Sequence, residues 1–162
     1  GQSIVSQQSI MPYALAESAI DIVLPMAESK HQKMTGHLPQ RLPHVWVDED
    51  MIRRVLINLL ENASKFTQPG GKIELGAKRD GDWLQMWVQD DGPGIPVADQ
   101  ERIFEKFTRL QQESSPNGLG VGLAFCRLAV EGHGGKIQLE SQVGQGSKFT
   151  ITLPLAKNLP EK

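Results

Sequence analysis

Asn58, Asn62 and Lys65 stand at helical spacing in this chain, so they form one stripe along a helix. An Asn carbonyl oxygen is a suitable ligand for Mg²⁺, and a Lys ammonium is a point charge suited to phosphate. Asn is a mediocre helix former, so two of them bordering an apolar face indicate that the stripe lines a cleft. Taken alone, the stripe is equally compatible with an ordinary solvent-exposed helix surface.

The segment from Asp90 to Pro96 ends an alternating apolar run with two carboxylates and a Gly-Pro-Gly turn. Asp90 closes the expected strand and therefore lies at the end of a sheet. An ionised carboxylate accepts hydrogen bonds, including one from the exocyclic amine of adenine. Gly92 and Gly94 permit positive φ and the close approach of a flat ring. Asp91 fits an ordinary turn better than a binding role.

A glycine cluster, Gly118, Gly120 and Gly122, opens an apolar helical stretch. The N-terminus of a helix offers free N–H groups and a partial positive charge, both suited to phosphate oxygens. No Gly-Lys-Ser/Thr follows, which excludes a P-loop, and no strand immediately precedes the cluster, which argues against a dinucleotide fingerprint. By itself the cluster indicates a flexible loop equally well.

The bulk composition is that of a soluble globular chain of 162 residues, with 39% hydrophobic and 22% charged residues. We expect one domain at residues 1–155 and a short tail at residues 156–162. A net charge of −2 gives no reason to expect nucleic acid or an acidic membrane as a partner. The single cysteine, Cys126, lies in an apolar helical stretch and is expected to be a buried, inert thiol.

The pattern of apolar residues predicts the elements that position these groups. Helices are expected at residues 13–28, 48–66 and 119–131, with a shorter helical region at 96–107 and Asp48 as an N-cap. Strands are expected at residues 4–10, 34–38, 72–78, 83–90, 136–141 and 147–153, the last four as two hairpins. Residues 39–47 are expected to be a connection, and residues 110–117 a loop. The prediction is an α/β fold: a two-layer sandwich with a mixed five-stranded sheet and three main helices.

In this order, the motifs resemble the catalytic ATP-binding domain of sensor histidine kinases, within the superfamily shared with gyrase, Hsp90 and MutL. The segments that carry the resemblance are residues 58–67 (N box), 90–94 (G1 box), 103–109 (F box), 118–123 (G2 box), and the last hairpin at 134–137 and 144–149. The likeness extends from about residue 10 to residue 153. It implies a Bergerat fold that binds ATP and Mg²⁺ beneath a lid between the F and G2 boxes.

The resemblance also implies a role for individual positions. Asn62 would ligate Mg²⁺, and Asn58 and Lys65 would hold the phosphates. Asp90 would bind the adenine amine, with Phe66 lining the pocket. The other positions placed at the nucleotide are Gly92, Gly94, Ile95, Arg109, Gly118, Leu119, Gly120, Gly122 and Leu123.

The implied function is transfer of the ATP γ-phosphate to a histidine on a separate dimerisation and phosphoacceptor domain, which serves a response regulator. None of the four histidines lies in a phosphoacceptor box, and His133 is expected to cap or pack at a helix end. A gyrase-type ATPase and a non-catalytic nucleotide-binding signalling module are the alternatives. The ATPase relatives use a Glu where this chain has Asn58, and an amide cannot act as a general base. We expect a monomeric, cytoplasmic fragment without direct membrane contact.

Overall fold

The computed structural model describes residues 6–105 and 119–156. Its helices are α1 (Pro12–Ser29), α2 (Glu49–Phe66), the short α3 (Val97–Gln100), the 3₁₀ turn η1 (Arg102–Phe104) and α5 (Leu119–Gly132). Its strands are β1 (Gln7–Ile10), β2 (Lys33–His37), β3 (Val45–Asp48), β4 (Lys72–Asp80), β5 (Trp83–Asp90), β6 (Ile137–Gln142) and β7 (Gly146–Pro154). Within these residues no helix combines the length and apolar character needed to cross a membrane.

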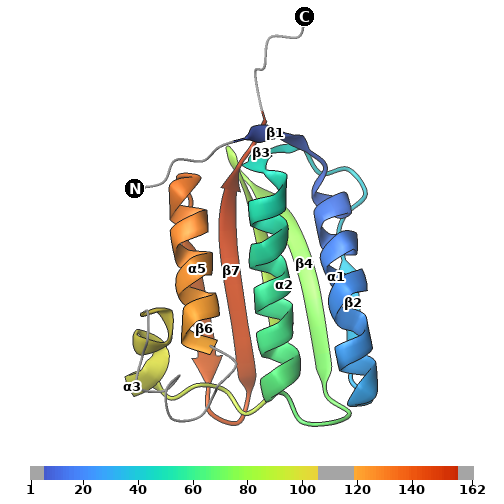
Figure 1. Ribbon diagram of the computed structural model, residues 1–162, viewed down its shortest axis with the longest axis vertical. Coiled ribbons are helices and arrows are strands. Elements are labelled where there is room, and N and C mark those ends of the chain that lie inside the picture. The colour runs from blue at the N-terminus through green and yellow to red at the C-terminus, as the bar shows by residue number, and fades with distance from the viewer. Residues whose placement is uncertain (1–5, 106–118, 157–162) are drawn as a thin grey trace, which may run out of the picture.

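Five strands form the main sheet, in the order β2-β4-β5-β7-β6. The β2–β4 pair is parallel and the other pairs are antiparallel, so the sheet is mixed. Helices α1, α2 and α5 lie side by side across one face (Figure 1). The prediction of a two-layer α/β sandwich with three main helices is confirmed, as is the β4–β5 hairpin.

Helix α2 lies between α1 and α5 in this layer, and both its N-cap and its apolar stripe explain why this segment is helical (Figure 1). Asp48 caps its N-terminus, where Oδ1 accepts a hydrogen bond from the Met51 amide at 3.1 Å. Its apolar stripe is fully enclosed between α1, α5 and the sheet, where Ile52, Val55, Leu56, Leu59 and Leu60 are almost inaccessible to solvent. The polar stripe with Asn58 and Asn62 therefore has a fixed rotation about the helix axis.

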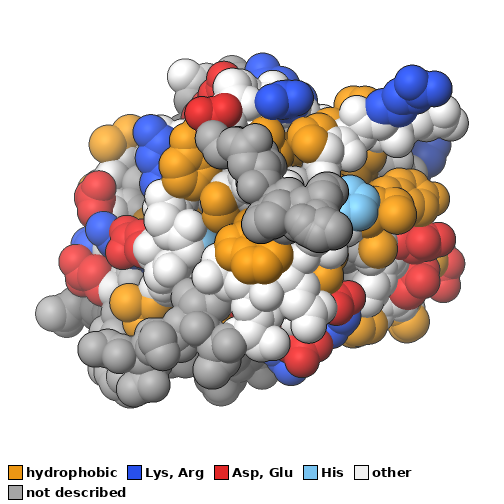
Figure 2. Space-filling view, turned by 90° about the horizontal axis from the view of Figure 1, so that it is seen from above, with side chains coloured by type: hydrophobic (Ala, Val, Ile, Leu, Met, Phe, Trp, Pro, Cys, Tyr) orange, Lys and Arg blue, Asp and Glu red, His pale blue; other side chains and the backbone are white. Residues whose placement is uncertain are grey.

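A second, two-stranded sheet is the main difference from the sequence prediction. Residues 39–47 were expected to be a connection, but Val45–Asp48 forms β3 and pairs antiparallel with β1. Strand β3 has only four residues, of which Val45, Val47 and Asp48 are buried. So short a segment shows no clear alternation of buried and exposed side chains, so periodicity could not identify this strand. Figure 2 looks onto this end of the molecule, where hydrophobic side chains reach the surface; Met11 and Tyr13, at the start of α1, are each about half exposed.

His133 joins the end of α5 to the start of α2. Its Nε2 accepts a hydrogen bond from the Asp48 amide at 3.0 Å, and its Nδ1 lies 2.7 Å from the Ala129 carbonyl oxygen. This pair of partners selects the neutral ring with the proton on Nδ1. The packing role expected for His133 is confirmed, and the buried ring connects helices α2 and α5.

Candidate functional site

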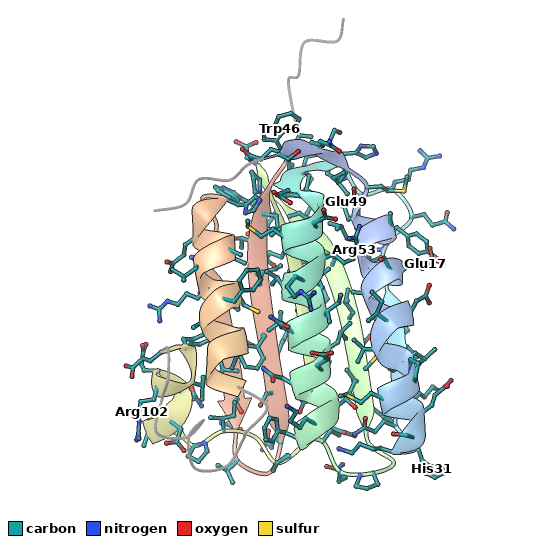
Figure 3. All side chains as sticks on the ribbon, viewed as in Figure 1. Glu17, His31, Trp46, Glu49, Arg53 and Arg102 are labelled. Atoms are coloured by element: carbon teal, nitrogen blue, oxygen red, sulfur yellow. The ribbon has the colours of Figure 1, made fainter. Side chains whose placement is uncertain are left out.

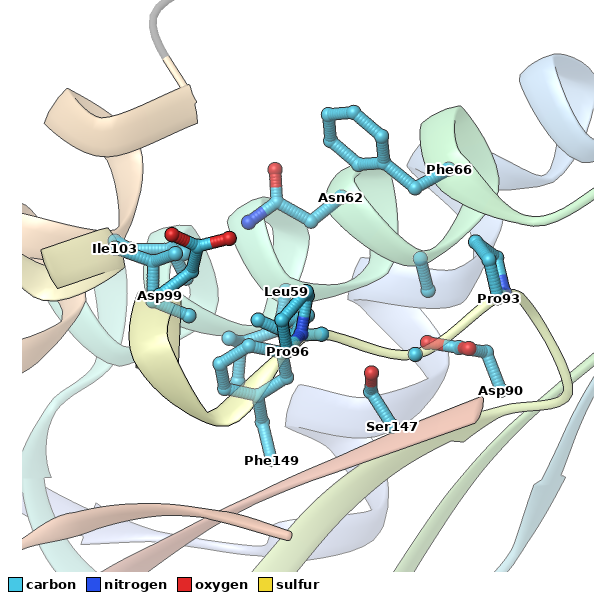
Figure 4. Close-up of a pocket in the computed structure, with 14 residues that line it drawn as sticks. Leu59, Asn62, Phe66, Asp90, Pro93, Pro96, Asp99, Ile103, Ser147 and Phe149 are labelled. Carbon is cyan, nitrogen blue, oxygen red and sulfur yellow. The ribbon is translucent and has the colours of Figure 1, made fainter. Parts of the chain in front are cut away.

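A cavity of about 220 Å³ opens between α2 and the segment that follows β5. Figure 4 shows Asn62 and Phe66 extending from α2 on one side, with Asp90, Ser147 and Phe149 on the other. The lining residues are Leu59, Asn62, Ala63, Phe66, Asp90, Pro93, Gly94, Ile95, Pro96, Asp99, Ile103, Leu123, Ser147 and Phe149. A mostly apolar cavity with a few converging polar groups is the usual form of a small-molecule site.

Asp90 is the last residue of β5, and its register partner on β7 is Ser147. One carboxylate oxygen accepts a hydrogen bond from the Gly92 amide at 2.9 Å. Burial raises the pKa of Asp90 and the nearby Asp91 charge adds to this, whereas the backbone amides of Gly92 and Ser147 act against it. A desolvated carboxylate facing a cavity is a strong acceptor for a ligand N–H group.

The loop after Asp90 is fastened to the β6–β7 hairpin. The Gly144 amide donates to the Pro93 carbonyl at 2.7 Å, and the Ile95 amide donates to Ser141 Oγ at 2.8 Å. Gly94 has a φ of 81°, and a Cβ there would collide with the backbone of Gln142. Only glycine tolerates both the positive φ and the close approach to Gln142. Gly94 therefore lets this loop lie against the β6–β7 hairpin, which leaves the cavity open.

Asn62 and Phe66 are one helical turn apart on α2 and both line the cavity. The Nδ2 atom of Asn62 is buried and has no hydrogen-bond partner among the described residues. An unpaired buried amide costs about 1–3 kcal/mol, so this group is suited to a partner that enters the cavity. Phe66 is 42% exposed, which leaves an aromatic ring at the cavity mouth.

Asn58 lies one turn before Asn62 but does not line the cavity. Its Nδ2 donates to the Gly122 carbonyl of α5 at 3.4 Å, so Asn58 and Gly122 are neighbours across the α2–α5 contact. Leu123, the next residue of α5, does line the cavity. The predicted N-box and G2-box positions therefore meet at one side of the cavity.

The other predicted positions are more dispersed. Lys65 is half buried at the end of α2 and Gly92 is buried behind Asp90, and neither lines the cavity. Leu119 and Gly120 form the first turn of α5. Arg109, Gly118 and the loop expected at residues 110–117 lie outside the described residues.

Several lining residues were not predicted from the sequence: Leu59, Ala63, Pro93, Pro96, Asp99, Ile103, Ser147 and Phe149. Leu59 and Ala63 share the face of α2 with Phe66, so their helical spacing could have identified them. Ser147 becomes a neighbour of Asp90 only through the β5–β7 register. Asp99 lies on the four-residue helix α3, which carries no periodic signal.

The sequence profile of a family described as histidine kinase-, DNA gyrase B-, and HSP90-like ATPase matches residues 47–157. The adaptive-response sensory kinase SasA of Synechococcus sp. (strain JA-2-3B'a(2-13)) is 44% identical over 142 residues, which cover 87% of this chain and 38% of that protein. SasA of Thermosynechococcus vestitus is also 44% identical over 142 residues, which cover 87% of this chain and 37% of that protein. The chain thus spans well under half the length of these relatives.

Solved structures show the same similarity in three dimensions. The catalytic domain of histidine kinase ThkA, in a nucleotide-free form, superposes with a TM-score of 0.84 at 26% identity and covers 93% of this chain and 97% of that one. Full-length ShkA in complex with AMPPNP superposes with a TM-score of 0.83 at 28% identity, covering 94% of this chain and 32% of that one.

Proposed function

The chain belongs to the family of histidine kinase-, DNA gyrase B- and HSP90-like ATPases, and on this premise we propose that it binds ATP with Mg²⁺ and donates the γ-phosphate to a histidine on a separate phosphoacceptor domain. The observation that carries the proposal is a cavity with a partly buried carboxylate, Asp90, and an unpartnered amide, Asn62. The similarity to sensory kinases and to a kinase catalytic domain supports the same conclusion.

The adenine ring would lie in the apolar part of the cavity. Asp90 accepts from the exocyclic amine, and the backbone at Gly94 and Ile95 lets the flat ring approach closely. Phe66 covers the ring from the α2 side. These groups orient the base and exclude water, which fixes the direction in which the phosphates leave the cavity.

The phosphates would extend toward the side where Asn58 and Gly122 meet. The N-terminal turn of α5, with Leu119 and Gly120, presents amides and a partial positive charge there. In the proposal, Lys65, Gly118 and Arg109 add further contacts. Phosphoryl transfer needs mainly positioning and charge neutralisation, and these groups are suited to both.

Asn62 fits a magnesium ion that arrives with the nucleotide. Within residues 6–105 and 119–156 no group of three or more His, Cys, Asp or Glu side chains could hold a metal by itself. Mg²⁺ is commonly held by one or two protein oxygens together with substrate phosphates and water. Asn62 lines the cavity, so its Oδ1 could supply one such oxygen, while Nδ2, which has no partner among the described residues, could donate to a phosphate oxygen. The bound ion would neutralise phosphate charge.

Asn58 favours phosphoryl transfer to a protein over hydrolysis. Its amide nitrogen already donates to the Gly122 carbonyl, and an amide cannot remove a proton from water. The acceptor would be a histidine of a dimerisation and phosphoacceptor domain in the same kinase, with a response regulator as the next acceptor. In this proposal the domain of residues 1–155 works in the cytoplasm.

Incubation with γ-labelled ATP and Mg²⁺ tests the proposal. The chain alone should stay unlabelled and release phosphate slowly. Addition of a purified helical domain that bears a phosphoacceptor histidine should give an acid-labile, base-stable label on that domain. The same domain with its histidine replaced by Gln is the control. Rapid phosphate release without transfer would contradict the kinase function and favour an ATPase.

A further inference from the structure

The C-terminal end of α2 is bound by two side chains from a different part of the chain, the turn between α1 and β2. Lys30 Nζ donates to the Ser64 carbonyl at 2.6 Å and to the Lys65 carbonyl at 3.1 Å. Gln32 Nε2 donates to the Ser64 carbonyl at 2.9 Å and to the Thr67 carbonyl at 2.8 Å. The last carbonyl groups of a helix have no partner within the helix, so these contacts satisfy groups that otherwise need water.

The Gln32 side of this contact is buried, Lys30 is half-buried, and the Gln32 amide is paired at both ends. Gln32 is 6% exposed, Ser64 is 0% and Thr67 is 2%. Gln32 Oε1 accepts from Ser64 Oγ at 2.7 Å, so both ends of the Gln32 amide are used. The Lys30 ammonium lies at the negative end of the helix dipole, which favours a cation. Thr67 Oγ1 has no partner among the described residues, but the carbonyls of Ser64, Lys65 and Thr67 are all paired, and paired buried groups favour one geometry.

The backbone joins the same two turns. The Gly70 amide donates to the Lys30 carbonyl at 3.0 Å, and the Lys33 amide donates to the Gly71 carbonyl at 2.9 Å. His31, between the two clamping residues, has a φ of 57°, in the left-handed region that is unfavourable for a non-glycine residue. Figure 3 shows His31 at the end of the molecule opposite Glu49, the first residue of α2. The left-handed turn at His31 thus lies where Lys30 and Gln32 converge on the end of that helix.

The clamped segment forms part of the cavity wall. Phe66, which lines the cavity, lies between Lys65 and Thr67, and the carbonyls of both these neighbours are clamped. Thr67 packs on the loop after Asp90, where a Cβ on Gly92 would be 3.1 Å from Thr67 Oγ1 and 3.0 Å from Asp90 Oδ1. A shift of the α2 end or of residues 67–71 would therefore move both Phe66 and the support of the Asp90 carboxylate.

We propose that Lys30 and Gln32 are positioning residues for the nucleotide: they hold the end of α2 and the turn at residues 67–71 so that Phe66 and Asp90 form the adenine-binding part of the cavity. This inference rests on the proposed nucleotide binding. Neither side chain lines the cavity, so both act through the segment they clamp.

The test compares ADP and adenosine binding by wild type, Lys30→Met, Lys30→Arg and Lys33→Met, well below their melting temperatures. Lys30→Met should weaken both ligands by about tenfold, or about 1.4 kcal/mol. Lys30→Arg retains a donor for both carbonyls and should restore affinity. Lys33 is an exposed lysine three residues away, so Lys33→Met controls for lost charge and should bind like wild type.

Each outcome has a distinct meaning. If wild type binds neither ligand, the proposed function itself fails. If wild type binds and Lys30→Met weakens ADP but not adenosine, Lys30 acts on phosphate by charge and the positioning role is wrong. If Lys30→Met melts at a lower temperature but binds both ligands normally, the positioning role is also wrong. The same holds if Lys30→Arg does not restore the affinity that Lys30→Met loses.

A variant of the other clamping residue, Gln32, tests the proposal independently of Lys30. Gln32→Met keeps the length of the side chain but removes both donors. Hydrogen exchange at residues 67–71 and 91–95 should accelerate in Gln32→Met and in Lys30→Met, while the centre of β5 stays protected. This exchange is measured without ligand. If the exchange rates at these two segments are unchanged in both variants, the proposed clamp is wrong.

Discussion

Asp90 and Ser147 are direct register partners on β5 and β7, and both line the same cavity. The pairing places a carboxylate and a hydroxyl side by side at one end of the sheet, beneath α2. Because burial raises the pKa of Asp90, the folded domain binds this proton more tightly than the unfolded chain does. The site therefore carries a stability cost at neutral pH, which a ligand N–H group would offset.

The first prediction concerns pH. Since the folded pKa of Asp90 is raised above 3.8, its contribution to stability is present below that value and is lost as pH rises through the folded pKa. Asp90→Asn should therefore gain stability relative to wild type as pH increases across this window. Urea unfolding of both proteins between pH 4 and 7 measures the difference; a difference that is flat with pH contradicts the raised pKa.

Gly94 and Gly70 form a matched pair for a second prediction, because their φ values are 81° and 82°. Gly70→Ala has open space around the new Cβ and should cost about 1–2 kcal/mol for the backbone alone. Gly94→Ala adds a collision with Gln142 and should lose clearly more stability as well as ADP affinity. Equal losses in denaturant melts would show that the loop is not held against the β6–β7 hairpin.

Cys126 supplies a third prediction. Burial raises the pKa of its thiol to about 12, so at pH 8 only about one part in ten thousand is thiolate. A thiol reagent should label the chain only as it unfolds, and the labelling rate should rise with urea. Since Cys126 is the sole cysteine, rapid labelling of native protein at pH 8 would show that α5 does not pack on α2 as described.

The fourth prediction separates metal binding from folding. Asn62→Ala removes an amide with a buried nitrogen that has no partner in the described residues, so the unliganded domain should keep its stability. Its ADP affinity in Mg²⁺ should fall by about tenfold, equivalent to about 1.4 kcal/mol, with little change in EDTA. Equal losses with and without Mg²⁺ would remove Asn62 from the metal site.

The sequence predicted the elements whose signals are local. Helix α2 has a long apolar period and an Asp48 cap, and β4 and β5 alternate around a short turn. Asp90 and Asn62 were predicted because their chemical types are unusual at a strand end and on a helix face. Both line the cavity.

The features that were missed depend on contacts between distant residues. β3 is too short to alternate and exists because β1 pairs with it. Asp99 and Ile103 reach the cavity only because the segment after Pro96 folds back beside it. The Lys30–Ser64 contact joins residues 34 apart, and nothing near Lys30 in the sequence distinguishes it from a surface lysine.

Calorimetric titration of ADP into wild type and Asp90→Asn tests the central claim, that this cavity binds an adenine nucleotide through Asp90. Wild type should bind in Mg²⁺, and Asp90→Asn should lose about 1–3 kcal/mol of binding free energy because the carboxylate acceptor is gone. A denaturant melt of each protein shows that the variant is folded. A folded Asp90→Asn with wild-type affinity, or a wild type that gives no binding heat and no ligand-induced stabilisation, would contradict the claim.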